Sequence, residues 1–254
     1  MNSDGHQNSS RGGLSTDNAR DFLRPIFKLI DQLNQVDWQG LFKAFEEGVK
    51  RHLIAGRRLA EKGWTIPAWM DISAPLDLCE LSQDELDKLL TAEYMQNDFR
   101  ILREQIEHLT SIPEMTKWNV LLCDIRESLI AGRHLIAIPA LLTILEGYAV
   151  THVLRLSAGT NVRKLFDKAG LHKQDGLQAL PAVSIYQFLE RVFEESAFHQ
   201  EPPQFINRYW VMHGRDRCDW IPADAFRLLN ALETLHWVDD VQADRPPSAS
   251  YRRD

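Results

Sequence analysis

The stretch IPALLTILEGYAVTHVLRL, residues 138–156, carries the strongest fold signal in this chain. Leu141, Leu142, Leu145 and Tyr148 recur at the spacing that places side chains on one broad helix face. A helix that is apolar around so much of its surface needs other elements packed on several sides. We therefore predict a central buried helix over residues 138–156, surrounded by other elements.

The rest of the chain repeats the helical pattern. No run alternates apolar and polar residues with period two, and no Asn-Gly or Asp-Gly turn joins two β-rich runs. Ser82 and Glu85 match the S-x-x-E capping box that begins a helix, Pro113 ends that helix, and Gly63 ends another. We predict an all-α bundle of about eight to ten helices. The predicted helices span residues 17–33, 38–61, 82–109, 121–129, 138–156, 161–169, 183–193, 205–212 and 223–238.

The folded part is expected to lie between two disordered tails. Residues 1–16 and 241–254 are rich in Ser, Asn, Gly or Pro and carry no apolar pattern. Between the tails we distinguish an N-terminal helical region, 17–110, with an aromatic loop at 63–75, from a helical domain over 111–240. A length of 254 residues allows one large domain or two closely packed ones.

Composition and charge exclude several classes of protein. Apolar residues make up 44% and charged residues 26% of the chain, which excludes fibrous and wholly disordered proteins. The net charge of -7 excludes a global basic surface for non-specific DNA binding, although arginines gathered in one cleft can still attract phosphate. The longest uncharged apolar run, 134–145, is shorter than the ~18 residues of a membrane span. With no secretory signal at its start, the chain is expected to be cytoplasmic, without a membrane span.

Motif searches favour no metal, nucleotide or disulfide site. The sequence has no GxGxxG, P-loop, HExxH, CxxC or GxSxG motif, and its nine histidines are scattered. We therefore expect no metal and no cofactor. Cys79, Cys123 and Cys218 are odd in number and widely spaced, so we predict reduced cysteines buried as small apolar side chains.

The most informative segment for function is FINRYWVMHG, residues 205–214. Gly214 directly follows His213, which predicts that the helix ends there and that its negative dipole end favours a protonated imidazole. Such a histidine suits general acid–base catalysis, and Arg208 could hold a phosphate through its planar fork of N–H groups. Five residues of helix turn about 500°, which leaves Arg208 and His213 about 140° apart, so they do not face each other as an i,i+4 pair would. Both side chains could still line a cleft between this helix and a partner.

This segment resembles the R-x(4–6)-H motif of the HEPN (higher eukaryotes and prokaryotes nucleotide-binding) superfamily. Arg103 and His108 show the same spacing within an acidic amphipathic helix, so spacing alone does not select a pair. The order Ile-Asn-Arg-x-x-x-x-His-Gly over 206–214, followed by a polar loop and a Leu-rich last helix, is similar to bacterial HEPN-like proteins. An apolar helix that ends in Glu-Gly, here Glu146-Gly147, also precedes the motif in those proteins. The resemblance covers about half of the chain.

The resemblance implies a metal-independent endoribonuclease of bacterial toxin and anti-phage defence systems. It implies that Arg208 and His213 are catalytic and that a ribose 2′-OH attacks the adjacent phosphate. It also implies a homodimer with the two motifs facing a shared groove, an RNA substrate such as tRNA, and an operon-encoded regulator. The other candidate site residues are Asn207 and Glu146, in supporting roles, and Tyr209, Trp210 and Arg215, as RNA contacts.

Two alternative functions remain open. Many active HEPN proteins have Asn, Asp or His directly after the motif arginine, whereas this chain has Tyr209. A non-catalytic interaction or regulatory module with a HEPN-like fold is therefore the second hypothesis, in which Arg208 pairs with a carboxylate and His213 caps a helix. The alternative for Tyr209 and Trp210 is that both are packing residues of the core or of a dimer interface. The third hypothesis is a helical bundle that binds a small molecule or nucleotide.

Overall fold

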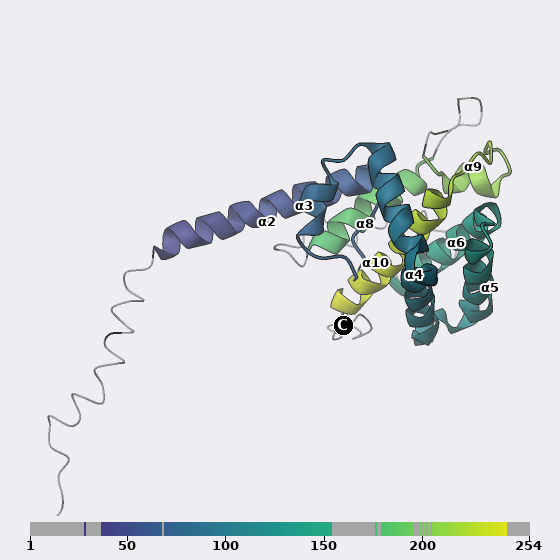
Figure 1. Ribbon diagram of the computed structural model, residues 1–254, viewed down its shortest axis with the longest axis horizontal. Helices are drawn as coiled ribbons and strands as arrows, with labels where there is room; N and C mark the ends of the chain where they lie inside the picture. Colours follow the sequence, from purple (N-terminus) through teal and green to yellow (C-terminus); the bar gives the residue numbers. More distant parts are fainter. Residues whose placement is uncertain are drawn as a thin grey trace, which may run out of the picture. The chain divides into compact units, whose positions relative to one another are not determined.

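Helices account for the regular structure of the described residues, and no strand occurs among them. The prediction of an all-α fold is therefore confirmed. The computed structural model describes residues 28, 37–67, 69–153, 176, 179–195, 199, 201, 203 and 205–242. Its α-helices are α2 (Trp38–Glu61), α3 (Ala74–Leu78), α4 (Gln83–Ser111), α5 (Asn119–Ile130), α6 (His134–Tyr148), α8 (Ala179–Val192), α9 (Arg208–Met212) and α10 (Pro222–Gln242) (Figure 1).

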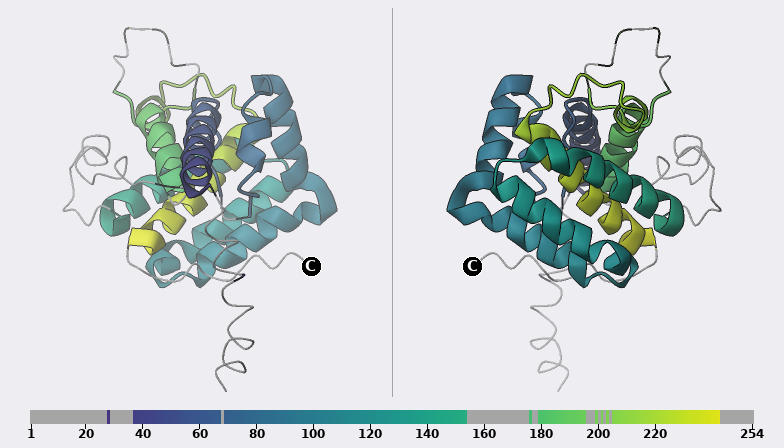
Figure 2. Two further views of the ribbon diagram at one scale, coloured as in Figure 1. Left: turned by 90° about the vertical axis from the view of Figure 1, so that its left-hand side faces the viewer. Right: turned by 90° about the vertical axis from the view of Figure 1, so that its right-hand side faces the viewer.

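Helix α10 packs against other helices on more than one of its faces. It contacts α6, α8, α4 and the π-helical turn η2 (Ala149–Val153), and Figure 2 shows it in yellow-green between α6 and α8. Its Leu228, Leu232 and Leu235 are fully buried. Helix α10 is therefore a core helix in addition to α6, which the sequence analysis singled out.

Helix α6 begins at His134 and ends at Tyr148, so the predicted span of 138–156 starts four residues too late. The chain continues from Tyr148 into η2, whose wider turn the three- and four-residue spacing did not predict. The end of the predicted span lies outside the described residues. Pro139 is the sixth residue of α6, so its missing N–H removes the intrahelical bond that this position would donate to the Leu135 carbonyl.

One described segment, His134–Val153, is long and apolar enough to cross a membrane by length and composition. Half of its most apolar window is buried inside the bundle, and α6 packs on both α5 and α10. Core helices of globular domains pass the same test, because an apolar helix surface is also what a protein interior requires. We therefore describe it as a core element.

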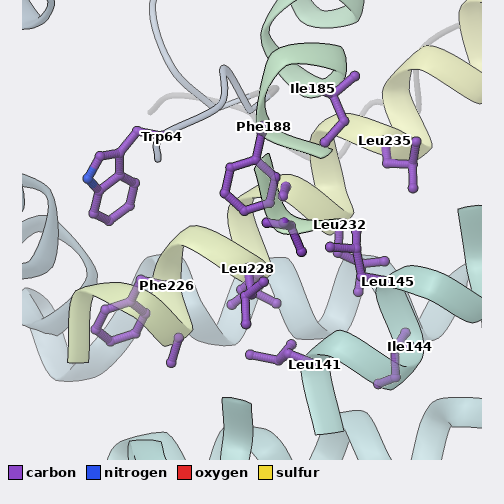
Figure 3. Packing of buried hydrophobic residues seen from close by; sticks show 14 of the residues in the cluster. Trp64, Leu141, Ile144, Leu145, Ile185, Phe188, Phe226, Leu228, Leu232 and Leu235 are labelled. Atoms are coloured by element: carbon purple, nitrogen blue, oxygen red, sulfur yellow. The ribbon is translucent and has the colours of Figure 1, made fainter. Parts of the chain in front are cut away.

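Aromatic and aliphatic side chains from distant parts of the chain share one core. Figure 3 shows Trp64, Phe188 and Phe226 beside Leu141 and Leu228 in this cluster, and all five side chains are buried. The chain forms two compact units, Met1–Phe45 and Glu46–Asp254, and this core belongs to the second. The core includes residues of both the predicted N-terminal region, 17–110, and the predicted helical domain, 111–240.

Helix α4 begins with the predicted capping box. The Ser82 hydroxyl accepts the Glu85 N–H, and the Glu85 carboxylate accepts the Ser82 N–H at 2.9 Å. The helix ends before Ile112, which is extended because Pro113 follows it. The predicted uninterrupted helix is corrected in its middle, where residues 96–99 leave the helical conformation and three of them have positive φ.

Several other predicted boundaries change. Helix α8 begins at Ala179, four residues before the prediction, and α10 extends to Gln242, beyond the predicted end of the folded part at 240. The short α3 and the 3-10 helix η1 (Pro113–Trp118) were not predicted. Outside the described residues lie the predicted tail 1–16, the helix 161–169, the tail from 243, and all of the predicted helix 17–33 except Lys28.

The three cysteines differ in exposure. Cys79 is buried, Cys123 is intermediate and Cys218 is exposed, and none forms a disulfide. The prediction that all three are buried is therefore wrong for Cys218. This residue lies in the polar loop between α9 and α10, outside the helices that form the core.

Candidate functional site

Asn207 determines where the short helix α9 begins. Its Oδ1 accepts the N–H groups of Tyr209 and Trp210 at 3.0 and 3.2 Å, and its Nδ2 donates to the Glu194 carbonyl at 2.8 Å. Asn207 is buried and extended, as is typical of a helix N-cap. The helix therefore begins at Arg208, three residues later than predicted, and Asn207 supports the motif by capping it.

The other end of α9 closes as the sequence predicts. His213 is the C-cap, and Gly214 follows in the left-handed conformation with a φ of 63°. The Gly214 N–H donates to the Val211 carbonyl at 3.0 Å, and the Arg215 N–H donates to the Trp210 carbonyl at 2.9 Å. These two bonds form a Schellman motif, which places His213 at the carboxyl end of the helix.

Arg208 is held by a carboxylate from another helix. Its Nε and Nη2 donate to the Glu146 Oε2 at 2.9 and 2.8 Å. The side chains of Arg208 and Glu146 are 30% and 29% exposed, so each keeps contact with solvent. The structure therefore brings together two of the candidate site residues, Arg208 and Glu146, and Glu146 holds Arg208 from the neighbouring helix, as the resemblance implies.

His213 is exposed and carries Tyr209 against its ring. The two ring centroids are 4.7 Å apart and the planes meet at 67°, an edge-to-face contact. Arg208 is thus the first residue of α9 and His213 directly follows the last, so a half-buried guanidinium lies at one end of the helix and a solvent-accessible imidazole at the other. A fork of N–H donors and an imidazole are the groups that metal-independent phosphodiester cleavage uses.

The remaining candidate contacts differ in exposure. Trp210 is 4% exposed and belongs to the bundle interior, which supports its interpretation as a packing residue. Arg215 is exposed and can reach a ligand. Tyr209 is half-buried, and its ring contacts the His213 imidazole edge to face. This contact favours a role in orienting His213 over a role in stacking on an RNA base.

The second Arg–His pair lies in two different environments. Arg103 is exposed and its guanidinium pairs with Asp98, whose carboxylate is 3.2 Å away. His108 is buried, with its Nδ1 3.5 Å from the Glu233 carboxylate. Because one side chain faces solvent and the other the interior, this pair forms no shared surface site.

A polar cavity of about 530 Å³ is lined by part of the loop that follows the motif. Asp216 and Trp220 of this loop line it together with Arg191 and Arg227. Burial lowers the pKa of Arg191, and the nearby charge of Arg227 lowers it further. This cavity is where the third hypothesis, a small-molecule site, would have to be tested.

The sequence analysis missed one cluster of metal-ligating residue types. His236, Asp239 and Asp240 are all buried on α10, and one potential ligand atom from each lies within 4.8 Å of the other two. The signal was present as H-x-x-D-D, a spacing of three and four residues that places side chains on one helix face. This spacing matches none of the established metal-binding motifs.

Comparison of the chain with protein-family models, curated proteins and solved structures finds no match. The function of the site therefore has to be argued from its own residues. The geometry provides a capped helix, a guanidinium held by Glu146, and an exposed imidazole at the carboxyl end.

Proposed function

We propose that this protein is a metal-independent endoribonuclease of HEPN type that acts in the bacterial cytoplasm, in toxin or anti-phage defence. The observation that carries the proposal is the placement of Arg208 and His213 at the two ends of α9, with Arg208 paired to Glu146. This pairing orients the guanidinium while leaving part of it open to solvent. The resemblance of residues 206–214 to the HEPN motif supports the same assignment.

In the proposed reaction, Arg208 binds the scissile phosphate and stabilises the negative charge that builds up on its oxygens. The ribose 2′-OH attacks the adjacent phosphorus, and one His213 accepts the proton of that hydroxyl. The bond to the 5′ oxygen breaks, and a second, protonated imidazole donates a proton to the leaving oxygen. The products are a 2′,3′-cyclic phosphate and a 5′-OH.

The need for both a base and an acid supports a homodimer. One chain supplies one His213, and the partner's His213 would supply the second across a shared groove. Exposed Arg215 would help to bind the RNA backbone of the substrate, for which tRNA is a candidate. Glu146 and Asn207 are positioning residues in this scheme, because they contact Arg208 and the backbone of α9.

The proposal is tested with purified full-length wild type, His213→Ala and Arg208→Ala, incubated with total RNA and with tRNA in EDTA. Wild type should cleave and leave cyclic phosphates, and both variants should lose cleavage at least about a hundredfold. Arg103→Ala is the matched control, since it removes an exposed arginine from the second Arg–His pair. Circular dichroism and dimer mass must be unchanged in all proteins, so that loss of fold cannot explain loss of cleavage.

The alternative is a non-catalytic interaction or regulatory module. One observation favours it: Nε and Nη2 of Arg208 both donate to Glu146, as in a structural ion pair. In that case wild type would not cut RNA in any preparation, and His213→Ala would change stability rather than cleavage. Expression in cells separates the two proposals independently, because a nuclease should slow growth in wild-type form only.

A further inference from the structure

Helix α2 changes character along its length. Near its carboxyl end, Leu59 and Ala60 are fully buried and belong to the core of the chain. Near its amino end, the large apolar side chains of Leu41 and Phe45 are 55% and 62% exposed. An amphipathic helix normally turns its apolar residues toward a packing partner. The amino-terminal half of α2 therefore presents to solvent the kind of surface that helices usually bury.

The exposed apolar residues of α2 form one continuous stripe. Leu41, Phe42, Phe45 and Val49 are spaced by one, three and four residues, so their side chains span about 100° of the helix surface. Val49 is intermediate in exposure and continues the stripe toward the buried half of the helix. A stripe of this width is typical of a helix face that packs against a second helix.

The two edges of this stripe differ in charge. Glu46 and Lys50 directly follow Phe45 and Val49, so both lie along one edge, about 100° around the helix from the apolar residue before them. Both charged residues are exposed. The residues directly before Phe45 and Val49 are an alanine and a glycine, so the other edge is uncharged. An edge with one acid and one base four residues apart complements a copy of itself that runs in the opposite direction.

A second copy of α2 in antiparallel orientation matches both the stripe and its charged edge. A two-fold axis perpendicular to the helices places each edge against the same edge of the partner. When Phe45 faces the partner's Val49, Glu46 of each chain comes next to the partner's Lys50. In a parallel pair the charged edge would instead face the uncharged edge, and neither ion pair would form. The charge pattern therefore favours an antiparallel pair of identical helices.

We propose that residues 41–50 of α2 form a self-association surface, through which two copies of this chain pair in antiparallel orientation. The apolar stripe forms the centre of the contact, where Phe45 and Val49 of each chain meet the partner's Val49 and Phe45. Burial of these side chains supplies the affinity. The two ion pairs between Glu46 and the partner's Lys50 lie at the rim, where charge pairs fix orientation more than they add affinity.

This inference goes beyond the proposed function and does not rest on it. The ribonuclease proposal requires a homodimer, and α2 supplies a contact between chains that uses neither Arg208 nor His213. A non-catalytic interaction module would use the same contact. The mass of the protein in solution tests the surface without any measurement of RNA cleavage.

The first test measures the mass of the full-length chain by sedimentation equilibrium in the absence of RNA. Wild type should form a dimer of twice the chain mass of 29.3 kDa. Phe45→Ser should raise the Kd of the dimer at least about a hundredfold, because both copies lose an aromatic side chain at the centre of the contact. Val120→Ser is the control, since it removes a 78% exposed apolar side chain from α5 and should leave the Kd unchanged. Circular dichroism checks that both variants keep their helix content.

Exchanged charges test the antiparallel orientation. Glu46→Lys and Lys50→Glu should each raise the Kd about tenfold, because each places like charges together at both ion pairs. A mixture of the two variants should form heterodimers with nearly wild-type affinity, since every charge then meets its opposite. The chain that carries both substitutions should also dimerise like wild type. Glu47→Lys makes the same charge change on the opposite face of α2, about 200° from Phe45, and should leave the Kd unchanged.

The proposal is overturned if wild type is a monomer at its highest soluble concentration, in which case the stripe belongs to another occupant, such as the predicted helix 17–33 or a different protein. It is also overturned if Phe45→Ser dimerises as tightly as wild type, or if mixing the two charge variants restores no dimer. A wild-type dimer that Phe45→Ser separates, but that cleaves no RNA, would support this surface and count against the ribonuclease. RNA cleavage by a protein whose α2 variants all remain dimeric would support the ribonuclease proposal alone.

Discussion

A single oxygen of Glu146, Oε2, accepts hydrogen bonds from both Nε and Nη2 of Arg208, at 2.9 and 2.8 Å. The two residues are 62 positions apart, and the contact joins the first residue of α9 to the last turn of α6. Because α9 has only five residues, it contributes little helix stability of its own. Its position therefore depends on the Asn207 cap, the Trp210 side chain in the core, and this ion pair.

The first prediction concerns the energy of that ion pair. Glu146→Gln and Arg208→Gln, alone and combined, should give a coupling free energy of about 1 kcal/mol in urea unfolding. The value exceeds that of a fully exposed pair because both side chains are mostly buried. A coupling free energy near zero would show that Glu146 does not hold Arg208 in solution.

The second prediction concerns the buried guanidinium of Arg227. It pairs with Asp87 and Asp224, each at 2.5 Å, and its side chain is 9% exposed. Arg227→Met leaves both carboxylates without that cation, so the free energy of unfolding should fall by about 3–5 kcal/mol. Arg58→Met is the matched control, because the Arg58–Glu80 pair is exposed and should contribute less than about 1 kcal/mol. Equal effects of the two substitutions in urea titrations would contradict the prediction.

The third prediction concerns the glycine that closes α9. A Cβ at Gly214 would meet no atom within 4 Å, so Gly214→Ala adds only the backbone cost of a φ of 63°, about 1–2 kcal/mol. Gly48→Ala, within α2 and also with open space around its Cβ, should instead stabilise by about 0.5–1 kcal/mol. Thermal unfolding distinguishes the two signs. If Gly214→Ala unfolds at the same temperature as wild type, α9 does not end in this conformation.

The fourth prediction concerns cysteine reactivity and its pH dependence. Burial raises the pKa of the Cys79 thiol, and its hydrogen bond to Glu80 raises it further, so little reactive thiolate forms at neutral pH. Cys218 is exposed and should be alkylated first, with Cys79 last. Raising the pH should therefore accelerate the labelling of Cys79 strongly. Mass spectrometry of the folded protein labelled with iodoacetamide checks the order, and early labelling of Cys79 would contradict it.

Local sequence patterns predicted much of the fold. The three- and four-residue spacing of apolar residues predicted α2 to the residue, and the Ser82 and Glu85 pair predicted the beginning of α4. Gly214 predicted the end of α9. Each of these features depends on residues within about one helical turn, whose interactions are the same in any helix.

Other features depend on which helices pack together. The contact of Glu146 with Arg208, the burial of Trp210 and the approach of Tyr148 to His236 and Asp239 all join residues on different helices or bury them between helices. No spacing in the chain specifies such contacts, since they form only when the whole apolar core is assembled. The residue order therefore specified α2, the capping box of α4 and the glycine that ends α9, but not α3, η1 or the break within α4. The packing of α6 against α10 and α9 established which charged side chains meet, because contacts between helices follow from how their surfaces fit together.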